Sequence, residues 1–125
     1  MYLEGRVVKA LWRNPHVELE LELKVPSALK LPSDLARRTL PAQSALVDGK
    51  ALLAKTTLPT RRDKQWEIEL APLTRLQAWN VAEIKPGTNL SVVGFAFSGE
   101  KGEAVLRAEF LFIDGKAYGL RSSPV

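Results

Sequence analysis

Hydrophobic and polar residues alternate without interruption from Val17 to Val25, where each Val or Leu is followed by Glu or Lys. Successive side chains of a β-strand point to opposite faces, so this pattern predicts a strand with one buried and one exposed face. The segment 65–70 repeats the alternation and places Trp66, Ile68 and Leu70 on the face expected to be buried.

Four further strands are expected, at 6–12, 90–97, 104–113 and 116–120. Val, Leu and aromatic residues are concentrated in these stretches, and polar turns separate them. Asp114-Gly115 joins the last two, and this dipeptide is typical of a tight hairpin turn that requires positive φ.

A single short helix is expected at about 72–79. Proline suits the first turn of a helix, and Leu73, Leu76 and Trp79 follow at nearly helical spacing. These three side chains predict an apolar edge that packs against the strands.

The segment 26–64 interrupts the strand pattern with four prolines. Within it, Ser33-Asp34 is a candidate cap for a short helix that would run through Arg38. The stretch 44–55 is expected to form a hairpin, because Asp48-Gly49 tolerates the positive φ of a type I′ turn.

Strands, one helix and then more strands, without β-α-β alternation, predict a mainly β protein. A small antiparallel OB-like barrel, closed at one end by the short helix, accommodates these elements. A chain of 125 residues fits one domain. We therefore expect a single OB-like domain over 1–125 with a Pro-punctuated basic insertion at about 26–64.

The strand expected at 104–113 is apolar on both faces. A period of two places Phe110 and Phe112 on one face with Leu106 and Ala108, and Leu111 and Ile113 on the other. Such a strand is either central in a closed barrel or contacts a partner. A homo-oligomer, or a surface for another protein or a small ligand, therefore stays open.

Composition excludes several classes of protein. The 46% hydrophobic and 26% charged residues are typical of a globular protein, and there is no cysteine for thiol, disulfide or iron–sulfur chemistry. No run of roughly 18 apolar residues is present, so no transmembrane segment is expected. The first residues lack the basic and apolar regions of a signal peptide.

The net charge of +4 has its source in the insertion. Eight Lys or Arg residues against three Asp give 26–64 a charge of +5, whereas 1–24 is neutral and 65–125 carries −1. Candidate contacts for an anionic ligand are Arg37, Arg38, Arg61, Arg62 and Lys64.

Single-stranded nucleic acid is one such ligand, since OB barrels bind it with a positive groove and aromatic platforms. Trp66, Phe95 and Phe97 are the aromatic candidates. The period of two, however, places all three among the core residues. Nucleic-acid binding is therefore less favoured than binding of another ligand.

His16 is the only histidine and a weak candidate for a metal ligand. Metal sites need several converging His, Cys or carboxylate groups, and Glu18, Glu20 and Glu22 are spread along one strand. We interpret His16 as part of the turn that Asn14-Pro15 begins, and we expect neither a metal nor a cofactor.

No catalytic constellation is recognisable, so we do not expect an enzyme. A serine triad would have only His16 as its base, and no phosphate-binding glycine motif occurs. The pairs Glu18/Glu20 and Glu67/Glu69 fall on polar strand faces. We interpret them as solvated surface carboxylates with ordinary pKa values.

Several short motifs resemble an uncharacterised family of small bacterial proteins with a W-x-N-P-H motif. The matching pieces lie within 5–25 and 65–115 and include Gly5-Arg6-Val7-Val8, Trp12-Arg13-Asn14-Pro15-His16-Val17, Trp66-Glu67-Ile68-Glu69, Leu73-Thr74-Arg75-Leu76 with Trp79, Ile84-Lys85-Pro86-Gly87 and Asp114-Gly115. Members are usually exported OB-like β-barrels of unsettled function. The insertion of about forty residues before Trp66 departs from the family pattern.

The resemblance implies a periplasmic or secreted protein and supplies no catalytic residues. Together with the residues, it favours a non-catalytic binding or accessory module of the bacterial envelope. The alternative is a cytoplasmic OB-type protein that binds single-stranded nucleic acid with its basic insertion.

Overall fold

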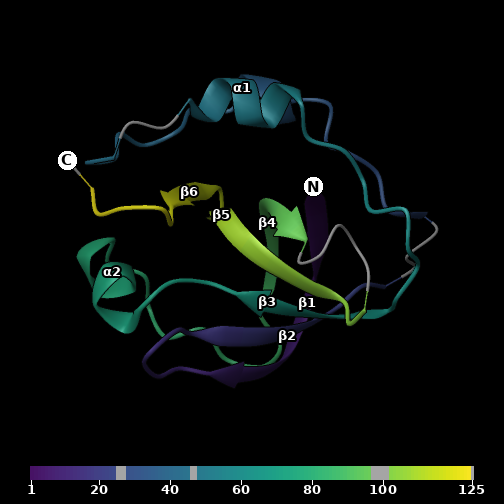
Figure 1. The fold of residues 1–125 in the computed structure, drawn as a ribbon, viewed down its shortest axis with the longest axis horizontal. Coiled ribbons are helices and arrows are strands. Elements are labelled where there is room, and N and C mark those ends of the chain that lie inside the picture. The colour runs from purple at the N-terminus through teal and green to yellow at the C-terminus, as the bar shows by residue number, and fades with distance from the viewer. Residues whose placement is uncertain (25–27, 46–47, 97–101, 125) are drawn as a thin grey trace.

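The fold comes from a computed structural model that describes residues 1–24, 28–45, 48–96 and 102–124. In these ranges six strands form one sheet (Figure 1). They are β1 (Tyr2–Leu11), β2 (Glu18–Glu22), β3 (Gln65–Glu69), β4 (Asn89–Ala96), β5 (Val105–Ile113) and β6 (Lys116–Gly119).

Five of the described strands close into a barrel in the order β3-β2-β1-β4-β5. Neighbours along this order are antiparallel, and a parallel pairing of β3 with β5 closes the ring. The prediction of a mainly β, OB-like barrel is confirmed. The barrel is antiparallel except at the β3–β5 closure, where the two strands run in the same direction.

The first strand is longer than predicted because it pairs with two partners. Its first half, Tyr2–Arg6, pairs with β4, and its second half pairs with β2. An irregularity between Val7 and Lys9 separates the two halves of the β2 pairing. Such bulges bend a strand and help a sheet to curl into a barrel.

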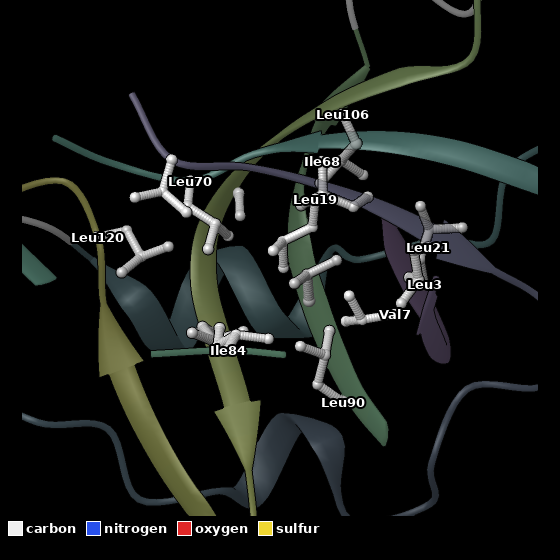
Figure 2. Close-up of a cluster of buried hydrophobic side chains, with 14 of the residues drawn as sticks. Leu3, Val7, Leu19, Leu21, Ile68, Leu70, Ile84, Leu90, Leu106 and Leu120 are labelled. Carbon is white, nitrogen blue, oxygen red and sulfur yellow. The ribbon is translucent and has the colours of Figure 1, made fainter. Parts of the chain in front are cut away.

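The inward side chains of the strands fill the barrel (Figure 2). The alternation predicted for β2 and β3 is confirmed, since Leu19, Leu21, Trp66 and Ile68 are buried. Figure 2 shows side chains from several strands pointing toward one another, among them Leu3, Val7, Leu90 and Leu106.

The predicted short helix is present as α2 (Leu73–Ala78), with Pro72 and Trp79 as its flanking caps. Leu76 is fully buried at one end of the core. Pro72 offers no side-chain cap, and Asn14 supplies one instead, because its Oδ1 accepts a hydrogen bond of 3.1 Å from the backbone N–H of Leu73. The Asn-Pro turn thus holds the start of α2.

The alternation in β5 changes phase, although the sequence predicts a constant period of two. The pairing of β5 with β4 shifts between Val93 and Gly94, which leaves Glu109 as an extra residue. Leu106 and Ala108 therefore face the barrel core together with Leu111, whereas Phe110 and Phe112 face outward. The predicted grouping of the two Phe with Leu106 and Ala108 is wrong, because a bulge reverses the faces of the residues beyond it.

The stretch 44–55 contains a helix, so the predicted hairpin is wrong. Helix α1 (Gly49–Ala54) begins at Asp48, whose side chain accepts a hydrogen bond of 3.0 Å from the N–H of Ala51. Asp48-Gly49 is therefore a helix cap, and the Ala and Leu residues after it favour a helix. A Cβ on Gly49 would overlap the side chain of Leu40, which shows how closely the helix packs.

The short helix expected from Ser33-Asp34 is a single 3₁₀ turn, η2 (Leu35–Arg37). Asp34 makes no side-chain cap and instead forms an ion pair of 3.4 Å with Arg38.

The insertion covers the outward face of β5. Leu35 and Leu53 from the insertion form a second buried cluster with Tyr2, Val93, Phe110 and Phe112. In Figure 1, α1 lies above the barrel on the side of β4, β5 and β6, away from β2. The second apolar face of β5 is thus buried by this chain itself. No helix in the described ranges is long and apolar enough to cross a membrane.

We predict that Asn14→Ala lowers the free energy of unfolding by about 1 kcal/mol, because the N–H of Leu73 loses its acceptor. His16→Ala is the control from the same turn, and it should change stability by less than about 0.5 kcal/mol, as exposed side chains usually do. Urea denaturation measures both. Equal losses for the two variants would contradict the assigned role of Asn14.

Candidate functional site

The outer faces of β2 and β3 bring glutamates directly opposite one another. In the pairing of these two strands, Glu18 lies opposite Glu69 and Glu20 lies opposite Glu67. Like charges at directly opposed positions destabilise a sheet, on the scale of about 0.2–1 kcal/mol per pair. Two such pairs in succession are a local electrostatic conflict built into the barrel.

A shallow groove of about 320 Å³ runs over this surface. Its charged lining consists of Glu18, Glu20, Glu67 and Glu103 with one cation, Lys9, which gives a formal charge of −4 + 1 = −3. We call these five residues and the surface between them the carboxylate groove. Glu103 precedes β5, so the groove includes the end of the connection from β4 to β5 as well as the sheet face.

The groove raises the pKa of Glu67 above its ordinary value. Partial burial is the largest cause, followed by the charge of Glu18 and a hydrogen bond with its side chain, and then by the charges of Glu103 and Glu69. The interpretation of Glu67 as an ordinary solvated carboxylate is therefore wrong. The sequence predicts the alternation of β3 correctly, but it does not predict that β2 lies opposite Glu67.

Cations are present mainly at the edges of this acidic face. Arg107 of β5 forms an ion pair of 3.1 Å with Glu69, and Arg6 of β1 lies 3.9 Å from Glu22. Lys9 lies opposite Glu20 in the β1–β2 pairing. Glu20 thus has a cation opposite it on β1, and Glu69 and Glu22 have cations at the edges of the face.

His16 lies beside the acidic face and is substantially exposed, with its Nδ1 3.8 Å from Oε1 of Glu69. In the described part of the chain, no group of three or more His, Cys, Asp and Glu side chains is arranged to hold a metal ion.

Two of the five predicted basic contacts are engaged within the insertion. Arg38 pairs with Asp34 and its guanidinium lies 4.8 Å from the ring centre of Phe112. Arg61 donates two hydrogen bonds, of 2.7 and 3.2 Å, to Asp63. The guanidinium of Arg61 also lies 5.7 Å from the ring centre of Trp66.

Both ion pairs also change the pKa values of the aspartates. The Arg38 guanidinium lowers the pKa of Asp34, and the Arg61 guanidinium lowers the pKa of Asp63. Both aspartates are therefore charged at neutral pH and offset part of the basic excess of the insertion.

The remaining candidates, Arg37, Arg62 and Lys64, are exposed. The structure does not gather the five residues into one patch. Arg38 lies at Phe112, near the end of β5, whereas Arg61 lies at Trp66, next to the pairing of Glu67 with the start of β5. The strand between these points is roughly 20 Å long at about 3.3 Å per residue.

The three aromatic candidates also have different environments. Trp66 is buried in the core, as predicted. Phe95 is 52% exposed, so its assignment to the core is wrong. It follows the shift in pairing at Gly94, beyond the part of β4 that the insertion covers. Phe97 lies outside the described residues.

Comparisons of this chain with protein-family models, with curated proteins and with solved structures gave no match. What the chain does is therefore argued from the geometry and charge of this surface.

We predict that Glu67→Gln raises stability at neutral pH by about 0.5 kcal/mol, because it removes a carboxylate whose ionised form is disfavoured by partial burial and by the charge of Glu18. The raised pKa of Glu67 in the folded protein means that its ionised form opposes folding. This penalty is absent below the unfolded-state pKa and grows as the pH rises through the folded-state pKa. The stabilising effect of Glu67→Gln should therefore vanish in acid.

Glu22→Gln is the matched control for this prediction. Glu22 lies opposite the neutral Gln65 and near Arg6, so its loss should leave stability unchanged or slightly reduced. Urea denaturation across the acidic to neutral range measures both variants. Destabilisation by Glu67→Gln at neutral pH would contradict the repulsion.

Proposed function

We propose that this protein is a non-catalytic binding module of the bacterial envelope whose carboxylate groove binds a cationic ligand. The observation that carries the proposal is the two pairs of directly opposed glutamates, Glu18 with Glu69 and Glu20 with Glu67. A sheet that keeps such a conflict departs from the rule that local choices support the fold, and departures of this kind are concentrated at functional sites.

The position of the groove also favours ligand binding. OB barrels bind their ligands on the face of strands 2 and 3 and with the loops that connect strands 1–2 and 4–5. The carboxylate groove lies on β2 and β3, and Glu103 belongs to the connection between β4 and β5. Partial burial raises the pKa of Glu67 most, and a bound cation would offset the further contribution from the charges of Glu18, Glu103 and Glu69.

The spacing of the carboxylates suggests the shape of the ligand. Glu18 and Glu20 lie on one face of a strand two residues apart, roughly 6.6 Å at about 3.3 Å per residue. An extended peptide presents every second side chain at the same interval. A peptide segment with Lys or Arg at alternate positions therefore matches the groove in both charge and spacing.

Nucleic acid is the less favoured ligand. The groove carries a formal charge of −3, which repels phosphate. Arg38 and Arg61 already pair with aspartates, and the basic residues of the insertion are spread along β5. These features favour a cationic ligand over a polyanion.

Two further parts of the proposal, a non-catalytic role and a location in the bacterial envelope, have separate support. The groove lies on a sheet face and is open to solvent. It therefore does not enclose a substrate next to Glu67 and shield it from water. The location comes from the resemblance of the Trp12–Val17 turn and the later motifs to a family of usually exported proteins.

We predict that a peptide of alternating Lys and Ser binds the protein in low salt and is released by high salt. Glu20→Gln combined with Glu67→Gln should weaken binding roughly tenfold, which corresponds to about 1.4 kcal/mol. Isothermal titration calorimetry measures the affinity, and a peptide of alternating Asp and Ser is the ligand control.

The charge-matched control protein carries Glu83→Gln and Asp114→Asn. Both residues are exposed and lie outside the groove, so binding should be unchanged. Equal affinity for the groove variant and this control would refute the site. Salt-sensitive binding of a single-stranded oligonucleotide, abolished by Arg61→Ala, Arg62→Ala and Lys64→Ala, would instead support the nucleic-acid alternative.

Fractionation of cells that express the native gene tests the proposed location in the envelope. Recovery from the periplasm is the expected result, and recovery from the cytoplasm alone would contradict it.

A further inference from the structure

We propose that the two described parts of the insertion, 28–45 and 48–64, are a cover that opens as one unit from the folded barrel, and that residues 120–124 are the clasp that holds it closed. This inference concerns the outer face of β4 and β5 and does not depend on the carboxylate groove. Its basis is the way in which three separate parts of the chain meet at Ser122.

The clasp binds the insertion through a compact set of hydrogen bonds. The hydroxyl of Ser122 accepts a bond of 3.0 Å from the N–H of Ala45 and donates one of 3.3 Å to Oε1 of Gln43. That amide oxygen also accepts from the N–H of Ser122, at 3.2 Å. The N–H of Ser44 donates to the carbonyl of Ser123, and Gln43 forms a β-bridge with Pro124.

The other side of the clasp is fixed to the barrel. Arg121 forms a bidentate ion pair with Glu109, the bulge residue of β5. From α2, Arg75 donates to the carbonyl of Leu120 at 3.0 Å, and the indole N–H of Trp79 donates to the carbonyl of Ser122 at 2.8 Å. The clasp therefore stays with the barrel when its contacts to the insertion are lost.

The insertion and the barrel bury largely separate sets of side chains, and Leu29 of the insertion packs against both. The insertion contributes Leu35 and Leu53, with Leu40, Leu52 and Leu58 packed around them, to the cluster that includes Phe110. The interior of the barrel is a different cluster, from Leu3 to Leu120. Parts of a protein with distinct contacts can open separately, at a lower free energy than global unfolding.

Opening need not disturb the strands on either side of the insertion. β2 and β3 pair along their whole length, and the N–H of Leu23 donates to the carbonyl of Lys64 at 2.7 Å. The two ends of the insertion are thus held together by the barrel itself. Between them, the N–H of Tyr2 in β1 donates to the carbonyl of Thr57, at 2.9 Å.

The open state would expose the outward side chains of Tyr2, Val93, Phe110 and Phe112. Together they form an apolar sheet face that is hidden while the clasp is closed. The barrel would keep its core, and its carboxylate groove is lined by residues of β1, β2 and β3 and by Glu103 rather than by the insertion.

Native-state hydrogen exchange of Ser122→Ala tests the proposal. Loss of a hydroxyl that both donates and accepts should increase opening roughly five- to thirtyfold. The reporters are the amides of Tyr2, Leu52 and Lys55, which are bonded to insertion carbonyls at a distance from Ser122. The amides of Val17 and Leu70, which bond within the barrel, should change less than about twofold.

Ser123→Ala is the matched control, because the hydrogen bond of Ser123 to Ser44 uses its backbone carbonyl and its side chain is exposed. It should leave all of these amides unchanged. Faster exchange confined to Ser44 and Ala45 would mean local fraying and would overturn the proposal. Equal acceleration of Val17 and Leu70 would overturn it as well, because the cover and barrel would then be one cooperative unit.

A second variant keeps the test decisive if Ser122→Ala fails to fold. Gln43→Cys with Pro124→Cys places a thiol pair across the existing β-bridge, and the chain has no other cysteine. The reduced form should expose the apolar face and bind the dye bis-ANS, whereas the oxidised form should not. Equal dye binding by both forms would contradict a clasp at this position.

Discussion

The fold depends on the need to bury both faces of β5. The bulge at Glu109 turns Leu106, Ala108 and Leu111 into the barrel and leaves Phe110 and Phe112 on its outside. Exposed together, two phenylalanines would be a strongly unfavourable patch. The insertion between β2 and β3 covers them, and its two short helices contribute the leucines that do so.

This arrangement divides the outside of the barrel into two regions with different physics. Over β4 and β5 the outer face is apolar and covered, with Ser122 linking the cover to the barrel. Over β2 and β3 the outer face is uncovered and carries opposed carboxylates. The two helices of the insertion thus lie over β4 and β5, whereas Arg61 near its end lies 5.7 Å from the ring centre of Trp66, which lines the carboxylate groove.

Much of the fold could be predicted from local patterns, because alternation and turn residues act over a few neighbours. The strand alternation around Trp66, the helix at 73–78 and the Asp114-Gly115 turn are of this kind. Asp48-Gly49 was ambiguous, since the same pair suits a hairpin turn and a helix cap. The bulge cannot be predicted from β5 alone, because it depends on the pairing with β4. For this reason the predicted faces of Phe95 and of the two phenylalanines of β5 are wrong.

The candidate site was missed for a similar reason. Each row of glutamates is an ordinary solvated face on its own strand, and the charge of Glu18 acts on Glu67 only when β2 pairs with β3, across more than forty residues of sequence. The sequence indicates the basic residues as the candidate site instead, because their excess is visible in the composition. Composition does not reveal that Arg38 and Arg61 have aspartate partners.

The most direct test of the proposed binding surface is a titration of the labelled protein with the alternating Lys-Ser peptide, followed by NMR. Our account predicts that the amide shifts change mainly at 18–20, 67–69 and 103 and stay constant across α1 and η2. Changes confined to the insertion, or no localised change at a concentration where calorimetry detects binding, would contradict it.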